Sequence, residues 1–305
     1  MGSDFIAVNW GSSNFRAYRM DGGGQVLDTW VEAAGIAALD RTGMALQVER
    51  LDRRWPGVER LYACGMIGSN IGWSDAGYAD CPIGLDGLAA RLHATTVAGR
   101  PMLIVPGLAC QRAADGAPDI MRGEETELFG LLGAGRLPRD GLVALPGTHG
   151  KWVRIVEGRV AEFMTAMSGE VFDRLTAQGL LASIVGGPAT VGAAFEAGVR
   201  AGAGGRLGLG TLLFGARARV IRHQLAREDA ASYLRGLLIG AEIADARTLY
   251  PFADGQAITL VGAGAVCAMY AEALSLLGHA SATVDAADAT TRGFAALHAM
   301  ARANT

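Results

Sequence analysis

The sequence predicts an α/β protein of two domains with mixed sheets. Two observations carry this prediction. Residues 5–30 and residues 142–163 each contain three short apolar segments joined by tight turns, and strands alternate with helical segments elsewhere. The likeness of these two segments indicates a degenerate internal duplication. A three-stranded antiparallel meander, present twice, is therefore the expected architectural unit.

The two meanders are defined by their turns. The first contains the strands FIAVNW, FRAYRM and QVLDTW, separated by the turns GSSN and DGGG. The second contains LVALP, KWVRIV and RVAEF, separated by GTHG and EG. Gly, Asn, Asp and Ser supply the backbone conformations that tight hairpins require. We expect each meander to fold locally.

The remaining elements follow from the spacing of apolar residues. Between the meanders we expect a helix near 44–55, a strand at 60–64, a loop-rich region to residue 86, a strand at 102–105 and a helix near 124–132. After them we expect helices near 169–177, 190–200, 209–226 and 230–248, a strand at 257–261, and helices at 265–277 and 286–302.

The domain boundary is expected near residues 108–118, a stretch that contains Gly, Ala, Asp and Pro. Such stretches are typical of connections between domains. This divides the chain into an N-terminal domain, residues 1–110, and a C-terminal domain, residues 111–305. The last helix can return to the first domain.

Composition narrows the classes of function. The 305 residues are 50 % hydrophobic, with 27 basic and 30 acidic residues, giving a net charge of −3. This balance lacks the basic patch that nucleic-acid binding requires, so a small-molecule partner is expected. The four cysteines show no metal-binding spacing, and the sequence predicts neither a signal peptide nor a membrane span. We expect a cytoplasmic protein, for which a homodimer remains open.

The first turn offers an anion-binding site. Gly11, Ser12 and Ser13 present backbone N–H groups and hydroxyls at a tight bend, and Arg16 follows on the second strand. Closely approachable N–H groups suit a phosphate. An isolated turn of this kind is more often an ordinary hairpin, but its repetition favours phosphate binding.

The second turn repeats this arrangement. Gly147 and Thr148 present donors at the bend, and Lys151 adds a charge suited to a phosphate. His149 is assigned to the positioning of phosphate or metal, with a purely structural histidine as the alternative. Together, the two turns predict a nucleotide-phosphate site between the repeats.

Glu124 stands at the start of a helix that leads into the second meander. A carboxylate there stabilises the helix dipole in any protein. The functional alternative is a general base that accepts the proton of an attacking hydroxyl group during phosphoryl transfer. Asp119 is the second candidate for this role.

Candidate substrate contacts lie in the loop at residues 63–73. Ser69 and Asn70 can hydrogen-bond hydroxyl groups, and the indole of Trp73 can cover an apolar face. Arg122 can pair with a carboxylate in fork geometry. A surface loop and a solvated arginine are the alternatives.

A third glycine-rich turn, Gly262, Ala263 and Gly264, joins a strand to a helix. Small residues there leave space for a flat base, so the turn is a candidate adenosine site. Close helix packing is the alternative.

The segments VNWGSSNFRAY, ACGMIGSNIGW, PDIMRGEETELFG, LPGTHGKWV and LRGLLIGAEIA resemble, in order, those of the 2-dehydro-3-deoxygalactonokinase family. The duplicated meander is the plan of its superfamily, which also includes actin, Hsp70 and other sugar kinases. The resemblance implies a two-domain actin-like ATPase fold, related to ribonuclease H. It also implies ATP-dependent phosphorylation of the C6 hydroxyl of 2-keto-3-deoxy-D-galactonate, with Mg²⁺ as cofactor.

The chain departs from this family at Asn9, where the first motif usually carries an aspartate. In related kinases that acid holds magnesium, commonly through water. Asn9 is therefore the candidate metal residue here, because an asparagine can coordinate through its carbonyl, although it brings no negative charge. A loss of about 2–3 kcal/mol in transition-state stabilisation would slow the reaction roughly thirty- to more than a hundredfold. The alternatives are therefore a catalytically impaired nucleotide sensor and a kinase of a related sugar acid.

Overall fold

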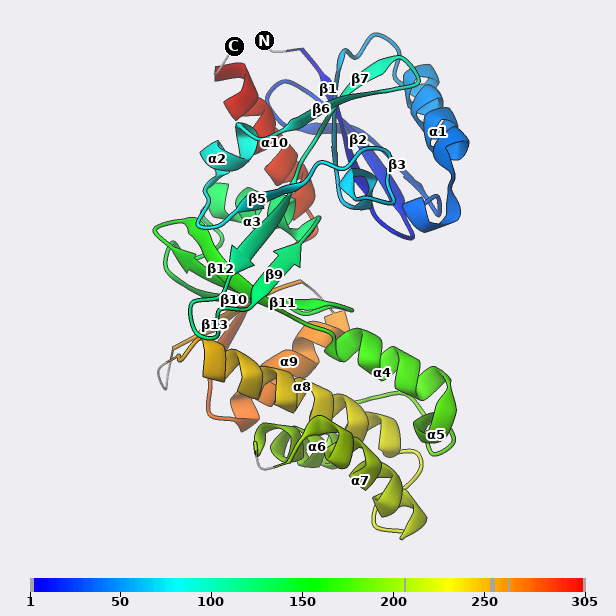
Figure 1. Cartoon of the computed structure of the whole chain (residues 1–305), viewed down its shortest axis with the longest axis vertical. Coiled ribbons are helices and arrows are strands. Elements are labelled where there is room, and N and C mark those ends of the chain that lie inside the picture. Colours follow the sequence, from blue (N-terminus) through cyan, green and yellow to red (C-terminus); the bar gives the residue numbers. More distant parts are fainter. Residues whose placement is uncertain (1–2, 206, 253–255, 263, 304–305) are drawn as a thin grey trace.

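The computed structural model describes residues 3–205, 207–252, 256–262 and 264–303. Two β-sheets organise the molecule (Figure 1). The first has the order β3-β2-β1-β4-β7-β6 and the second has the order β12-β11-β10-β13-β14. The bounds of the first sheet are β1 (Phe5–Trp10), β2 (Phe15–Met20), β3 (Val26–Glu32), β4 (Arg60–Cys64), β6 (His93–Val97) and β7 (Arg100–Ile104). Those of the second are β10 (Gly141–Leu145), β11 (Gly150–Val156), β12 (Arg159–Ala166), β13 (Ile258–Val261) and β14 (Ser281–Val284).

The two sheets confirm the predicted duplication. In the first, β1 pairs antiparallel with β2 and parallel with β4. In the second, β10 pairs antiparallel with β11 and parallel with β13. Each first hairpin is anchored by a fully buried indole, Trp10 in one half and Trp152 in the other. Because both tryptophans lie in apolar cores, they fix the hairpins rather than meet a ligand.

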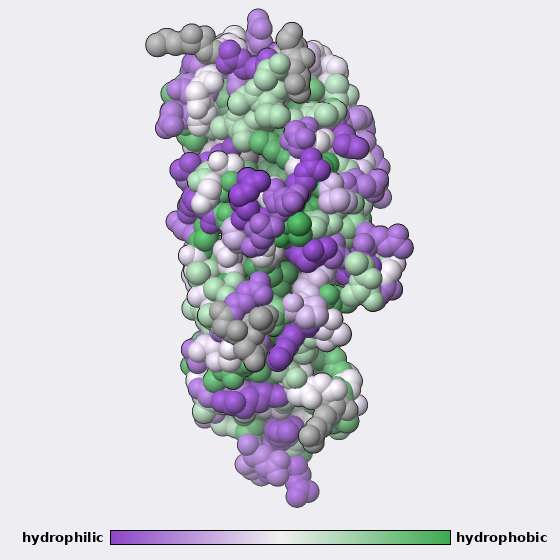
Figure 2. Space-filling model, turned by 90° about the vertical axis from the view of Figure 1, so that its left-hand side faces the viewer, coloured by the Kyte–Doolittle hydropathy of each residue, from purple (hydrophilic) through white to green (hydrophobic). Residues whose placement is uncertain are grey.

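Helices cover these sheets, and a helical region extends from the second one (Figure 1). The described helices are α1 (Arg41–Arg54), α2 (Leu85–Ala89), α3 (Glu124–Gly133), α4 (Ser168–Ala177), α5 (Gly179–Ala182), α6 (Ala193–Ala203), α7 (Leu209–Ile221), α8 (Ala230–Leu249), α9 (Gly264–Leu276) and α10 (Ala289–Ala303), with 3₁₀ turns η1 (Ile36–Ala38) and η2 (Met66–Gly68). Among the described residues, no helix is long and apolar enough to cross a bilayer. The face in Figure 2 mixes hydrophilic and hydrophobic side chains.

The last helix returns to the first half of the chain. The ring of His298 on α10 stacks on Phe5 with centroids 4.2 Å apart, and its Nδ1 lies 3.1 Å from the Tyr62 hydroxyl. The helix also packs tightly on α3, since a Cβ at Gly130 would lie 2.2 Å from the Ala289 carbonyl oxygen. Helix α10 therefore fixes α3 against the first sheet.

Several short elements differ from the sequence predictions. A three-stranded sheet, β5 (Tyr78–Asp80), β8 (Gly107–Gln111) and β9 (Pro118–Met121), occupies segments expected to be loop or boundary. Strands of three to five residues carry too little periodicity to stand out from turns. The helix expected at 209–226 ends at Ile221, because the chain turns at His223, whose φ is 56°. The division proposed between residues 110 and 111 falls at the end of β8.

Candidate active site

The first loop, residues 11–14, is braced from one side. Gly11 N–H donates to the Asn14 carbonyl at 3.0 Å. The carbonyls of residues 11–13 accept hydrogen bonds from the N–H groups of residues 35–37 at 3.0–3.2 Å. The C=O and N–H of one peptide point in opposite directions. The N–H groups of residues 12–14 therefore face away from residues 35–37. Such an array of N–H groups suits an anion.

The carboxyl ends of β1 and β4 meet the start of α3. Asn9 pairs in register with Arg16 on β2, and with Cys64 on β4. A Cβ at Gly65 would lie 3.6 Å from Asn9 Oδ1, and a Cβ at Gly123 would lie 3.7 Å from the Gly65 Cα. The close approach of these glycine backbones brings the acidic turn of α3 next to the first hairpin.

Glu124, the first residue of α3, forms an ion pair with Lys151. Its Oε1 lies 3.1 Å from Lys151 Nζ, which also donates to the His149 carbonyl at 2.9 Å. Glu124 Oε2 is buried and has no hydrogen-bond partner. Lys151 thus holds one carboxylate oxygen of Glu124, the predicted base. The other oxygen receives no hydrogen bond from any donor among the described residues.

Two further acids on this turn were not singled out from the sequence as site residues. Glu125 is fully buried and accepts a hydrogen bond from Gly123 N–H at 2.6 Å. Burial, reinforced by the nearby Glu124 charge, raises the pKa of Glu125 to about 8. Glu127 accepts from Thr290 Oγ1 at 3.1 Å, and burial raises its pKa. The sequence did contain a signal for Glu127. Its i, i+3 spacing from Glu124 places both acids on one face of the helix.

The second loop is held by the start of α4. His149 Nε2 lies 2.6 Å from Glu170 Oε2, and Glu170 N–H donates to the Thr148 carbonyl at 3.0 Å. The hydrogen bond from His149 lowers the pKa of Glu170. A Cβ at Gly169 would lie 2.4 Å from the Gly147 carbonyl oxygen. The close approach of α4 to the second loop therefore requires glycine at this position. Glu170 therefore braces this loop.

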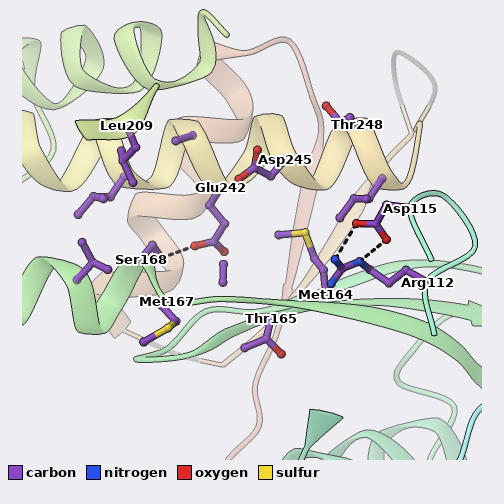
Figure 3. A pocket seen from close by; sticks show the side chains of 15 residues that line it. Arg112, Asp115, Met164, Thr165, Met167, Ser168, Leu209, Glu242, Asp245 and Thr248 are labelled. Atoms are coloured by element: carbon purple, nitrogen blue, oxygen red, sulfur yellow. Dashed lines mark hydrogen bonds and ion pairs between the residues drawn. The ribbon is translucent and has the colours of Figure 1, made fainter. Parts of the chain in front are cut away.

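Glu242 on α8 ties together the elements beneath the second loop. Its carboxyl group accepts hydrogen bonds from Trp152 Nε1 and the Tyr270 hydroxyl, both at 2.8 Å, and from Ser168 Oγ. Burial raises the pKa of Glu242. Figure 3 shows the Ser168 contact. Four elements, β11, α4, α8 and α9, are connected through this one side chain.

A cavity of about 540 Å³ brings many predicted site residues together. Its lining includes Ser69, Asn70, Arg122, Glu124, His149 and Lys151. Arg122 is only 5 % exposed, lies 4.4 Å above the Tyr78 ring and donates to the Gly77 carbonyl at 3.0 Å. Its Nε and Nη1 are buried without a hydrogen-bond partner. This cavity therefore has a cation in its wall and hydroxyl-binding groups around it.

Among the predicted catalytic and substrate-binding residues, Trp73 and Asp119 do not line this cavity. The Trp73 Nε1 donates to the Thr96 carbonyl at 3.0 Å, and Arg41 lies 4.2 Å from its ring centroid. Asp119 accepts from both the N–H and the hydroxyl of Thr165 at 2.7 Å and pairs with Arg112 at 3.1 Å. Asp119 thus joins β9 to β12.

A second cavity, of about 350 Å³, adjoins the first through two shared residues, Glu124 and His149. Its lining also includes Glu127, Gly147, Thr148 and Gly262. Gly262 has a φ of 138°, a conformation that favours glycine, and Gly264 begins α9. Ala263 lies outside the described residues. The first loop lines neither cavity.

A third cavity, of about 500 Å³, lies between β12 and α8 (Figure 3). It is lined by Asp245, Glu242, Ser168 and the ion-paired Arg112 and Asp115, among others. None of the residues predicted from the sequence lines it. The pair of adjoining cavities is therefore the better candidate for the active site.

Comparisons with known proteins identify the family of the chain. A family model described as 2-keto-3-deoxy-galactonokinase matches residues 9–297. The chain is 37 % identical over 300 residues to a Rhizobium meliloti (strain 1021) protein named as a probable 2-dehydro-3-deoxygalactonokinase, covering 96 % of this chain and 95 % of the relative. It is 33 % identical over 279 residues to the 2-dehydro-3-deoxygalactonokinase of Escherichia coli (strain K12), covering 91 % of each.

Solved structures show the same relationship. A Sinorhizobium meliloti protein assigned to the same family superposes with a TM-score of 0.86 at 36 % identity, covering 98 % of this chain and 99 % of that one. The activator of 2-hydroxyisocaproyl-CoA dehydratase from Clostridium difficile, solved with bound ADPNP, has a TM-score of 0.50 at 10 % identity, covering 99 % of this chain and 96 % of that one. This second likeness concerns the fold alone, which is that of the actin-like ATPases and sugar kinases. The chain belongs to the 2-keto-3-deoxy-galactonokinase family of sugar-acid phosphotransferases.

Proposed function

We propose that the chain transfers the γ-phosphoryl group of ATP to the C6 hydroxyl of 2-keto-3-deoxy-D-galactonate. The names of the curated relatives support this substrate. The observation that carries the proposal is the position of Glu124, which lines both adjoining cavities. A base placed there reaches an acceptor in one cavity and faces a phosphate in the other. The two proposed domains, residues 1–110 and 111–305, would enclose this site.

The larger cavity is assigned to the sugar acid. Asn70 is exposed and can hydrogen-bond a substrate hydroxyl. The Ser69 hydroxyl donates to the Met66 carbonyl at 2.8 Å, which leaves its lone pairs for a substrate donor. The charge of Arg122 attracts the substrate carboxylate, and direct contact with its buried Nε and Nη1 would require the cavity wall to rearrange. Trp73 would then act by supporting the loop rather than by covering the sugar.

The smaller cavity is assigned to the nucleotide. The N–H groups of Gly147 and Thr148 suit phosphate oxygens, and Gly262 leaves room for the adenosine. Lys151 lines the larger cavity, where its pairing with Glu124 places its charge beside the smaller one. Ser12, Ser13 and Arg16 complete the phosphate site when the two halves close, since the first loop lines neither cavity. Closure also excludes water, which would otherwise hydrolyse the phosphoryl group.

In this reaction Glu124 accepts the proton of the attacking hydroxyl group as general base. Its pairing with Lys151 keeps the carboxylate oriented and leaves the buried Oε2 without a protein partner, so a shift that opens this oxygen to the cavity would let it accept the proton. Magnesium, when bound, neutralises charge on the phosphate oxygens. The oxygen ligands around the smaller cavity fit this ion, because Mg²⁺ is commonly held by one or two carboxylates together with phosphates and water.

A coupled assay with ATP, magnesium and 2-keto-3-deoxy-D-galactonate tests the proposal. We expect ADP release that depends on both substrates, with the phosphate found on C6 of the product. Folded protein that releases no ADP above background would contradict the proposed reaction. Preference for another sugar acid in competition would redirect it to a related substrate.

Asn9 favours a second candidate, a nucleotide-binding sensor with impaired catalysis. In that case the chain binds ATP without turnover. The Asn9→Asp variant separates the two candidates. A large rise in rate identifies an enzyme limited by the missing charge, whereas binding without turnover in both forms supports the sensor.

A further inference from the structure

The first hairpin lacks the carboxylate expected at its end. Asn9 is the penultimate residue of β1, in register with Arg16. The close approach of Gly65 and Gly123 sets this strand end against the first turn of α3. A carboxylate on the first turn of α3 would therefore place a negative charge near Asn9, which has none.

Glu127 is placed to supply that charge. It lines the smaller cavity together with Gly147 and Thr148, the residues of the second loop. Its Oε1 accepts a hydrogen bond from Thr290 Oγ1 of α10 at 3.1 Å, which holds the carboxylate from behind. The positive charge of Arg16 acts on the same carboxylate. Glu127 thus lines the proposed phosphate site beside the second loop, within electrostatic reach of Arg16 on the first hairpin.

The other two acids on this turn differ from Glu127 in their contacts. Glu124 Oε1 is paired with Lys151, although its buried Oε2 is without a partner. Glu125 is fully buried and accepts from Gly123 N–H. Among the acids at the start of α3, Glu127 lines the smaller cavity and forms no ion pair with any cation in the described part of the chain.

We propose that Glu127 replaces the missing carboxylate at Asn9 by orienting the hydrated divalent cation that accompanies the nucleotide phosphates. The proposal rests on the proposed function of the smaller cavity. Mg²⁺ retains several water molecules and needs only one or two carboxylates beside the phosphates. This agrees with the finding that no three described His, Cys, Asp or Glu side chains form a metal cage.

A purely structural role is the competing explanation, because the Thr290 hydrogen bond joins α3 to α10. The two roles differ in what they change. Loss of a structural tie lowers the free energy of unfolding and affects nucleotide binding equally with and without magnesium. Loss of a cation contact weakens only the enhancement that magnesium gives to nucleotide binding. The ratio of the two nucleotide affinities is therefore the decisive quantity.

Calorimetric titration of a non-hydrolysable ATP analogue, with magnesium or with a chelator, measures this ratio in the full chain. We expect Glu127→Gln to reduce the magnesium enhancement about 10- to 100-fold, the usual range for residues that support metal ligands. Affinity without magnesium should stay constant or rise, because a negative charge near the phosphates is removed. Asn9→Asp introduced into Glu127→Gln should restore much of the enhancement.

Two control variants accompany the test. Glu49→Gln, on the exposed face of α1, removes one acid far from the cavity and should leave the ratio unchanged. Thr290→Val removes the tie between helices and should mainly lower stability. An unchanged ratio in Glu127→Gln would overturn the role of Glu127 while leaving the proposed function intact. Absence of nucleotide binding in the unaltered chain would instead overturn the proposed function itself, and this proposal with it.

Discussion

Lys151 Nζ lies 3.1 Å from Glu124 Oε1, which joins the second residue of β11 to the first residue of α3. The lysine side chain is 5 % exposed and the glutamate side chain 29 %. Opposite charges attract more strongly away from bulk water. The pair therefore fixes both groups at the border between the two cavities, where an acceptor hydroxyl and a phosphate would meet.

The first prediction concerns the base. Glu124→Gln keeps the shape of the side chain but cannot accept a proton at neutral pH. We expect kcat to fall about 10²- to 10⁴-fold, the usual contribution of general base catalysis, while calorimetry finds similar nucleotide affinity. Glu49→Gln is the matched control. Activity within about twofold of the unaltered chain would remove Glu124 from this role.

The second prediction concerns the cation of the pair. Lys151→Met leaves Glu124 partly buried without its counter-charge, and it should lower the free energy of unfolding by about 1.5–3 kcal/mol. Urea titration measures this. The double variant with Glu124→Gln should recover part of the stability, because the unpaired charge is gone. It should recover none of the activity, because the proposed base is also removed. Strictly additive losses of stability would show that the two groups are not coupled.

The third prediction concerns the carboxyl group beneath the second loop. Glu242→Gln places an amide against the three donors of Trp152, Ser168 and Tyr270, so at least one of them loses its acceptor. We expect a loss of about 1–3 kcal/mol in the free energy of unfolding. The KM for ATP should rise more than the KM for the sugar acid. Equal stability of the two proteins would argue against this network as a support of the loop.

The fourth prediction concerns pH. The His149 hydrogen bond lowers the pKa of Glu170 from its usual value of 4.5. A carboxyl group whose pKa is lower in the folded state stabilises the protein above the unfolded pKa, and this contribution is lost as pH falls through the folded pKa. The difference in Tm between the unaltered chain and Glu170→Gln should be complete at about pH 6 and shrink below about pH 4.5. A difference independent of pH would exclude the ionic contribution.

The sequence by itself determined the repeating architecture. Turn residues and alternating apolar positions act within a few residues, so both meanders, the loops that open them and most helices could be predicted. The family could be predicted as well, because its segments are long and occur in order. Short strands such as β5 and β9 escaped detection, since their pairing depends on partners elsewhere in the chain.

Only the tertiary structure decided which side chains meet. It set Trp73 against Thr96 and Arg41, engaged Asp119 with Thr165, and gave Glu170 a contact with His149. The contact between Glu127 and Thr290 joins residues 163 positions apart. This last pairing arises from the packing of α10 on α3. None of these pairings leaves a local pattern in the sequence. For this reason the two glycine-rich turns were predictable from residue types, whereas the position of Glu127 beside the second of them was not.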